Sequence, residues 1–326
     1  MNESVVLQKP SKPRKSRAKK IIIIIATVLV VLFIGLLIFI PYAIMPMFLG
    51  QHYEQQQFNS SDYGISSERI TLVTDDSLSL AAWRTRAETE TSKGTIIILS
   101  GIQNPSVTAF FGYAKMFADH GWDSLLIEMR ARGESEGEEI GLGLTEWRDV
   151  KAGVEFLRAD QEVKDLPIVA LGTSMGGSTV ITAAGELPEV SAVISISAFS
   201  SWSDVFIYNM EMNGMPKAIS VMDTPFLNAY LGFHFGFNTL KYSTEKSIVK
   251  LGERPILMMH STGDSQIPYE QFEKLLSKAK KHNIDVTTFV REGDEHFVCY
   301  EQYSENPAED IEFSQAVLNF LAAKFP

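Results

Sequence analysis

Residues 170–177 read Ala-Leu-Gly-Thr-Ser-Met-Gly-Gly and place Ser174 in the spacing Gly-x-Ser-x-Gly. A serine hydroxyl becomes a nucleophile when a histidine removes its proton and a carboxylate orients that histidine. The apolar run at 167–172 predicts a buried strand, and the residues from Met175 onward predict a helix. A serine between them would lie on a tight turn, with the amide of Met175 at the helix N-terminus, where an oxyanion is stabilised. The alternative is a glycine-rich turn with an unreactive serine.

Two of the six histidines stand where a base could reach this turn. His296 lies in Glu-Gly-Asp-Glu-His-Phe, between the last predicted strand and the last predicted helix, whereas His260 lies inside a predicted strand, where a histidine is more often a core residue. We therefore favour His296 as the base. Asp264 follows that strand in Ser-Thr-Gly-Asp and is the expected carboxylate, while Asp294 and Glu295 are expected to be solvated loop charges.

The chain order Ser174, Asp264, His296 is the order found in the α/β-hydrolase fold. The segments Gly-Thr-Ser-Met-Gly-Gly, Ser-Thr-Gly-Asp-x-x-Ile-Pro and Gly-Asp-Glu-His-Phe resemble those of membrane-anchored serine hydrolases related to serine aminopeptidases and monoacylglycerol lipases, over roughly residues 69–324. The resemblance implies acyl transfer to water through an acyl-enzyme, with no metal or organic cofactor. The aromatic and methionine side chains at about 200–250 suit an apolar acyl chain, so we expect a small-molecule or lipid-like ester as the substrate of an esterase or lipase-like enzyme.

Two segments depart from the pattern of these relatives. Many relatives have His-Gly where this chain has Ser-Gly followed by Ile102; because the expected donor is a backbone N–H, Ile102 is predicted to complete the oxyanion hole with Met175. Relatives often show Asp-x-Arg-Gly-x-Gly-x-Ser, and residues 128–135 here read Glu-Met-Arg-Ala-Arg-Gly-Glu-Ser. We expect the second segment to shape a loop and to do no chemistry.

The elements that would position these residues alternate between strands and helices. Strands are predicted at 69–74, 78–85, 95–100, 122–129, 167–172, 190–199, 255–261 and 286–291, and helices at 107–120, 145–157, from 175, at 269–282 and at 308–323. Continuous apolar strands that alternate with amphipathic helices predict an α/β fold, with a mostly parallel central sheet covered by helices on both faces. The stretch at about 200–250 does not follow this alternation of strands and helices, and it is rich in Met, Phe and Asn. We expect it to be a cap insertion over the site.

A separate organisation is predicted before residue 69. Residues 1–20 carry seven Lys or Arg and one acid, and residues 21–40 contain no charged side chain. Twenty helical residues span about 30 Å, the thickness of a bilayer's hydrocarbon core. We therefore predict a cytoplasmic tail at 1–20, a transmembrane helix at 21–40, a stalk at 41–68 and an extracellular hydrolase domain at 69–326, in a single-pass protein of the cell membrane. A cleaved signal peptide is disfavoured because bulky residues, and no small-residue cleavage site, follow the apolar run.

The remaining composition narrows the class of function. Beyond residue 20 the chain has 22 basic and 39 acidic side chains, which argues against a nucleic-acid partner. The lone Cys299 excludes an internal disulfide and is expected to be a buried small side chain. Two alternatives to an esterase stay open: a peptidase or amidase that uses the same triad, and an inactive hydrolase fold that serves as an extracellular binding module.

Overall fold

A computed structural model describes residues 15–50 and 56–326 of the chain. Its strands form one eight-stranded sheet in the order β1-β2-β4-β3-β5-β6-β7-β8, in which β1 and β2 are antiparallel to their neighbours and the other pairings are parallel. The strands are β1 (Ser67–Val73), β2 (Ser79–Thr85), β3 (Thr95–Leu99), β4 (Asp123–Ile127), β5 (Ile168–Thr173), β6 (Val190–Ile196), β7 (Ile256–Ser261) and β8 (Val286–Arg291). The predicted mostly parallel sheet is confirmed.

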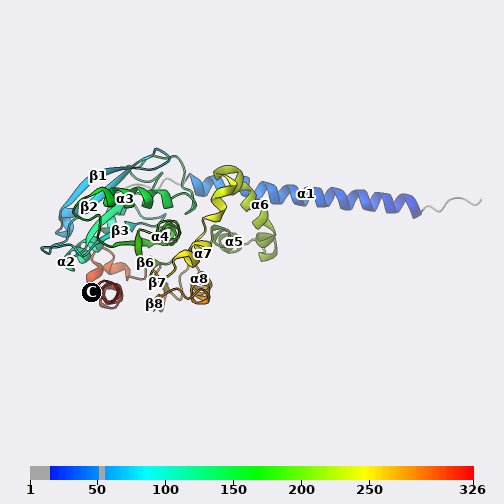
Figure 1. Ribbon diagram of the computed structural model, residues 1–326. Coiled ribbons are helices and arrows are strands. Elements are labelled where there is room, and N and C mark those ends of the chain that lie inside the picture. Colours follow the sequence, from blue (N-terminus) through cyan, green and yellow to red (C-terminus); the bar gives the residue numbers. More distant parts are fainter. Residues whose placement is uncertain (1–14, 51–55) are drawn as a thin grey trace, which may run out of the picture.

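Helices cover both faces of this sheet (Figure 1). The body helices are α2 (Phe111–Asp119), α3 (Trp147–Ala159), α4 (Met175–Glu186), α8 (Tyr269–Lys281) and α9 (Ile311–Lys324). Alternate residues of β3 belong to different cores: Ile97 packs with the cluster that includes α3, α4 and α8, and Ile98 packs with the cluster that includes α2 and α9. Both faces of the strand are buried, and this accounts for its unbroken apolar sequence.

The insertion predicted at about 200–250 is helical and lies between β6 and β7. It consists of α5 (Trp202–Met212), α6 (Lys217–Phe235), a 3-10 turn η3 (Phe237–Lys241), α7 (Thr244–Ser247) and a second 3-10 turn η4 (Ile248–Lys250). Trp202, Phe206 and Leu227 are buried within the apolar cluster on this side of the sheet. Much of the insertion's aromatic and methionine content therefore builds its own core.

The N-terminal helix α1 (Lys15–Leu49) is longer than the predicted membrane segment at 21–40. Among the described residues it is the one helix long and apolar enough to cross a membrane. The predicted stalk at 41–68 instead begins as helix, because the apolar residues Met45 and Leu49 are buried against the rest of the protein. Residues 51–55 of that stretch, and residues 1–14 of the predicted basic tail, lie outside the described residues.

Candidate active site

Ser174 lies on the turn between β5 and α4, as the sequence predicted. Its backbone has φ 55° and ψ −119°, a conformation that is strained for a residue with a side chain. The amide of Ser174 donates to the carbonyl oxygen of Ile196 at 2.8 Å, which ties the turn to the neighbouring strand β6. A strained serine at the end of a buried parallel strand is the geometry of a nucleophile elbow.

The glycines around Ser174 are required by close backbone approach. A Cβ on Gly172 would lie 2.3 Å from the carbonyl carbon of Gly176. A Cβ on Gly176 would lie 2.6 Å from the carbonyl oxygen of Ser100, at the end of β3. These separations are shorter than any real Cβ contact, so the turn forms only with glycine at both positions.

His296 and Asp264 are brought together from the loops that follow β8 and β7. The Nδ1 of His296 lies 2.8 Å from Oδ2 and 3.0 Å from Oδ1 of Asp264. Asp264 Oδ1 also accepts hydrogen bonds from the amides of Gln266 and Ile267, each at 2.9 Å. Burial alone would raise the pKa of Asp264, but the hydrogen bonds with His296 and Ile267 outweigh burial and hold that pKa below its usual value. The carboxylate is therefore ionised at neutral pH and fixes the imidazole with Nε2 free to act as a base.

His260, which the sequence placed in the core, also contacts this carboxylate. Its side chain is fully buried, and its Nε2 lies 2.9 Å from the carbonyl oxygen of Ile267 and 3.5 Å from Oδ2 of Asp264. Burial lowers the pKa of His260, so the ring is neutral at physiological pH. The interpretation of His260 as a core residue is confirmed. The structure adds that its ring lies next to the carboxylate of Asp264. The signal in the sequence was the spacing of four residues between the strand histidine and Asp264.

Ser174, Met175 and Ile102 line one cavity of about 280 Å³. The side chains around it are mainly apolar and come from the cap, from the end of α1 and from the loops after β3, β6 and β7. The other lining residues are Phe48, Gln103, Phe199, Trp202, Val205, Tyr208, Asn209, Met212, Ser265, Gln266 and Ile267. The structure thus places the predicted nucleophile beside both residues whose backbone amides were predicted to form the oxyanion hole.

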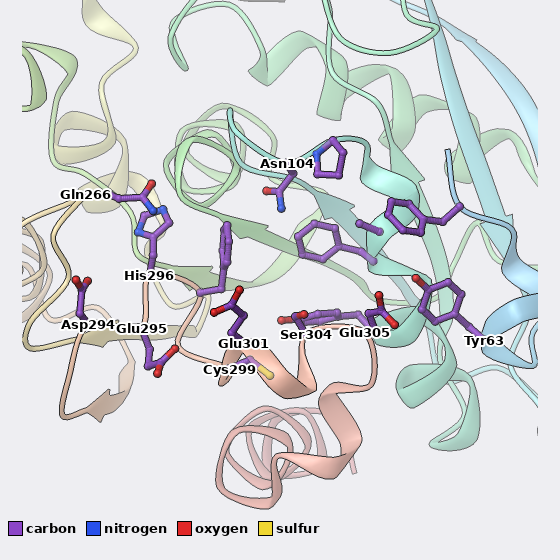
Figure 2. A pocket seen from close by; sticks show the side chains of 16 residues that line it. Tyr63, Asn104, Gln266, Asp294, Glu295, His296, Cys299, Glu301, Ser304 and Glu305 are labelled. Carbon is purple, nitrogen blue, oxygen red and sulfur yellow. The ribbon is translucent and has the colours of Figure 1, made fainter. Parts of the chain in front are cut away.

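His296 lines a second cavity, of about 450 Å³, which shares Gln266 with the first (Figure 2). In the described part of the chain no hydrogen bond joins the Oγ of Ser174 to His296. Such contacts are often long in ligand-free sites and tighten when substrate binds. Figure 2 shows His296 and Gln266 at one end of this cavity, with Tyr63 and Glu305 at the other.

The segment at 128–135, which was expected to shape a loop, also holds the loop that carries Ile102. The carboxylate of Glu128 accepts a hydrogen bond from the Oγ of Ser106 at 2.7 Å, and Arg132 donates to the carbonyl oxygen of Asn104 at 2.8 Å. The Oδ1 of Asn104 in turn accepts from the amide of Gly101 at 2.7 Å. These contacts fix the backbone on either side of Ile102 without contributing a reacting group.

A buried ion pair closes the base of the loop that carries His296. Arg291, at the end of β8, donates two hydrogen bonds of 2.8 Å to the carboxylate of Asp310, which caps α9. The guanidinium also lies over the ring of Tyr300, at 3.8 Å from its centroid. The two ends of the loop at 292–309 are thereby joined, and this limits how far His296 can move.

Comparisons with known proteins agree with this architecture. The prolyl oligopeptidase family model matches residues 140–325, and the X-Pro dipeptidyl-peptidase family model matches residues 47–224, so each spans more than half of the chain. The uncharacterized protein YfhR of Salmonella typhi is 24% identical over 243 residues, which cover 70% of this chain and 74% of YfhR.

Solved structures of low sequence identity share the fold. The Pyrococcus furiosus esterase Pf2001 superimposes with a TM-score of 0.65 at 19% identity, covering 83% of this chain and 98% of the esterase. The Pyrococcus horikoshii acylaminoacyl peptidase superimposes with a TM-score of 0.61 at 16% identity, covering 80% of this chain and 42% of the peptidase. The two family matches, the order of the strands and the elbow together show that this chain is a hydrolase. It belongs to the α/β-hydrolase serine hydrolases, in the group that includes the prolyl oligopeptidase and X-Pro dipeptidyl-peptidase families.

Proposed function

We propose that the protein hydrolyses acyl esters through a triad of Ser174, His296 and Asp264. The observation that carries this proposal is the apolar cavity at the elbow, because it offers space for an acyl group directly beside Ser174. The hydrogen-bonded His296–Asp264 pair, supplied by the two loops that follow β7 and β8, provides the base that a serine nucleophile needs.

The proposed reaction uses the ring nitrogen of His296 that does not face Asp264. The Nδ1 of His296 faces Asp264, so Nε2 takes the proton from the Oγ of Ser174 as that oxygen attacks the substrate carbonyl. The amides of Met175 and Ile102 stabilise the tetrahedral oxyanion. His296 then gives its proton to the departing alcohol, which leaves Ser174 acylated. A water molecule, deprotonated by the same imidazole, attacks the acyl-enzyme, and His296 returns this proton to the Oγ of Ser174 as the bond to the acyl group breaks and the carboxylic acid leaves.

Cleavage of an amide or peptide bond is the second candidate, and the cavity in Figure 2 favours it. Glu295, Glu301 and Glu305 line this cavity together with several aromatic rings, and Glu305 lies at the end away from His296. A carboxylate-rich pocket with aromatic walls suits a protonated amine, such as the N-terminus of a peptide. Replacement of Glu301 and Glu305 by Gln would then slow the hydrolysis of aminoacyl amides and leave the hydrolysis of neutral esters unchanged.

We further propose that α1 anchors the enzyme in a membrane with its N-terminus in the cytoplasm and its catalytic domain outside. Most apolar side chains between residues 21 and 36 are exposed, whereas the end of the helix from Leu37 onward packs on the domain. A helix that continues into the folded core is poorly suited to removal as a signal peptide, because cleavage would strip apolar side chains from that core. The Lys and Arg residues before the apolar run support this orientation.

The test is to label the full chain, in detergent, with a fluorophosphonate probe beside the variants Ser174→Ala and His296→Ala. Labelling of the wild type that is lost in both variants would support the triad, and a panel of esters and aminoacyl amides would then decide between the two candidate functions. A folded wild type that neither reacts with the probe nor hydrolyses any member of the panel would refute both candidates and favour the binding module.

A further inference from the structure

The last three turns of α1 are built into the hydrolase domain. Met45 and Leu49 are fully buried, and the carbonyl oxygen of Leu49 accepts a hydrogen bond of 3.1 Å from the amide of Ile140. The ring of Tyr42 stacks edge-on against Tyr230 of the cap helix α6, with 4.9 Å between the ring centroids. The end of α1 is therefore in contact both with the part of the domain outside the cap and with the cap itself. A helix that only tethered the domain to a membrane would not need these contacts.

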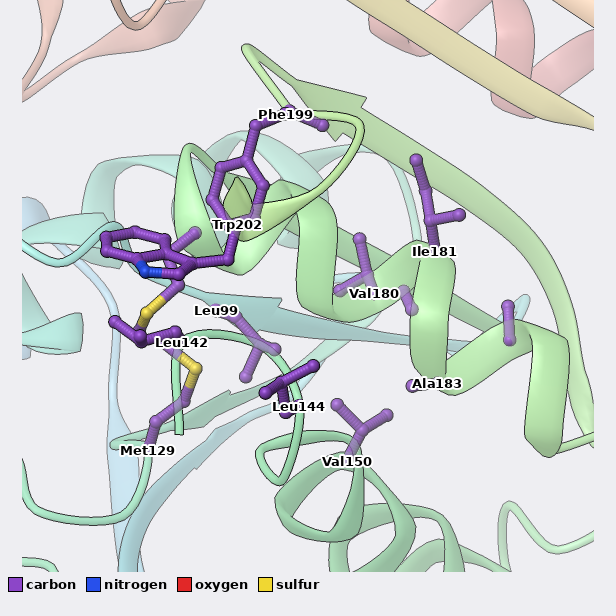
Figure 3. Packing of buried hydrophobic residues seen from close by; sticks show 14 of the residues in the cluster. Leu99, Met129, Leu142, Leu144, Val150, Val180, Ile181, Ala183, Phe199 and Trp202 are labelled. Atoms are coloured by element: carbon purple, nitrogen blue, oxygen red, sulfur yellow. The ribbon is translucent and has the colours of Figure 1, made fainter. Parts of the chain in front are cut away.

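Phe48 extends this docked end into the cavity that contains Ser174. It is half-buried and lines the cavity of about 280 Å³. Its ring meets Trp202 edge-on at 5.6 Å, and Trp202 meets Phe199 in the same way at 6.0 Å. Figure 3 shows the rings of Trp202 and Phe199 beside one another. Since all three aromatic residues line the cavity, Phe48 completes an aromatic wall that neither the cap nor the body forms alone.

From this arrangement we propose that Phe48 is a specificity-determining residue, and that the end of α1 sets the size of the group accepted next to Ser174. The inference rests on the proposed role of Ser174 as the nucleophile, but it holds for an ester or an amide substrate alike. Val205 and Met212 of α5 also line the cavity, so aliphatic side chains and aromatic rings together bound the space next to Ser174. A smaller side chain at position 48 enlarges the cavity, and a larger one shortens it.

Two neighbouring residues of one helical turn make a matched comparison. Met47 precedes Phe48, is 69% exposed and does not line the cavity. Replacement of Met47 by Ala therefore changes the same part of α1 without changing the cavity. The pair Phe48→Ala and Phe48→Trp changes the cavity in opposite directions, whereas a purely structural role of Phe48 predicts a similar loss in both variants.

The experiment measures the rate at which Ser174 is labelled by a homologous series of alkyl fluorophosphonates, from ethyl to dodecyl, using the full chain in detergent. Phe48→Ala is expected to move the preferred chain length upward, with a gain of up to about fourfold for each additional methylene that the enlarged cavity buries. Phe48→Trp is expected to move the preference to shorter chains. Met47→Ala is expected to keep the wild-type profile.

The possible failures are distinguishable. An unchanged chain-length profile in both Phe48 variants, with or without a uniform loss of rate, would overturn the specificity role and leave the proposed hydrolase intact. A wild-type chain that no member of the series labels would overturn the proposed nucleophile and the inference with it. A shift of equal size in Met47→Ala would show that the profile reports the general stability of α1, and it would also overturn the inference.

Discussion

Asp223 on the cap helix α6 gives a stability prediction whose size follows from the structure. Its side chain is fully buried, and neither carboxylate oxygen has a hydrogen-bond partner among the described residues. Burial raises the pKa of Asp223 to about 6, from an ordinary value of 3.8. Each tenfold change in an ionisation constant corresponds to about 1.4 kcal/mol, so keeping this group ionised at neutral pH costs the folded chain about 3 kcal/mol.

The direction of the pH dependence follows from the raised pKa. The folded chain binds this proton more tightly than the unfolded chain does. The cost is absent below the unfolded pKa of 3.8, grows as the pH rises toward about 6, and is constant above that. Replacement of Asp223 by Asn removes the ionisable group. The free energy of unfolding of the variant therefore lacks the decrease between pH 3.8 and about 6 that Asp223 causes in the wild type.

The assay is urea-induced unfolding of the full chain in detergent at several pH values, followed by tryptophan fluorescence, since Trp202 lies in the cap. The difference in unfolding free energy between Asp223→Asn and wild type is expected to be near zero at pH 4 and to reach about 3 kcal/mol in favour of the variant by pH 7. Asp165→Asn, at an exposed position, is the control and should change little at any pH. A difference of the same size at pH 4 and pH 7 would refute the assignment of the cost to an ionised Asp223.

Three further predictions concern the site. Asp264→Asn, which removes the carboxylate 2.8 Å from Nδ1 of His296, should lower the rate constant of acyl transfer by about 10⁴-fold with little loss of folded protein, measured by ester turnover and circular dichroism; an activity within tenfold of wild type would contradict the role given to Asp264. Asp310→Ala removes the buried partner of Arg291 and leaves it only the exposed Glu312 at 3.8 Å, so it should destabilise the fold by about 3–5 kcal/mol in urea unfolding. The double variant Arg291→Met with Asp310→Leu should recover much of this loss, and equal stability of the single and double variants would count against a buried charge as the cause. Gly176→Ala places a methyl group 2.6 Å from the carbonyl oxygen of Ser100, and it should abolish labelling of Ser174 by the fluorophosphonate, so labelling at the wild-type rate would show that the elbow tolerates this contact.

Much of the scaffold was predictable because its local signals agree with its tertiary environment. β3 is apolar at consecutive positions because helices cover both faces of the sheet, and the pattern alone indicates a buried parallel strand. The elbow was predictable because a strand, a turn with glycines and a helix follow one another in sequence. The proximity of Asp264 and His296 followed from topology, since loops after adjacent parallel strands emerge at the same edge of a sheet.

Contacts between elements distant in sequence could not be predicted in this way. An apolar helix has the same sequence character whether a side chain faces lipid or a protein domain, so nothing in residues 41–49 indicated that Phe48 would line the site. The same limit applies to Asp223, because its burial depends on how the cap helices pack. His260 has the residue type of a catalytic base, and its spacing of four residues from Asp264 was the one sequence signal that its ring would contact this carboxylate.

The contacts divide the molecule into the proposed reacting groups and the walls of the cavity beside Ser174. Ser174, Asp264 and His296 all come from loops at the carboxyl ends of strands in the sheet, where hydrogen bonds and close backbone packing fix their positions. Much of the wall of the cavity comes instead from the cap and from Phe48 of α1, which lie outside the sheet, and the rest comes from loops after β3, β6 and β7. Proteins of 16–19% identity can therefore share this scaffold and still differ in substrate. Since α1 is both the proposed membrane anchor and part of the cavity wall, a fragment that begins after residue 50 would keep the proposed reacting groups but lose part of that wall.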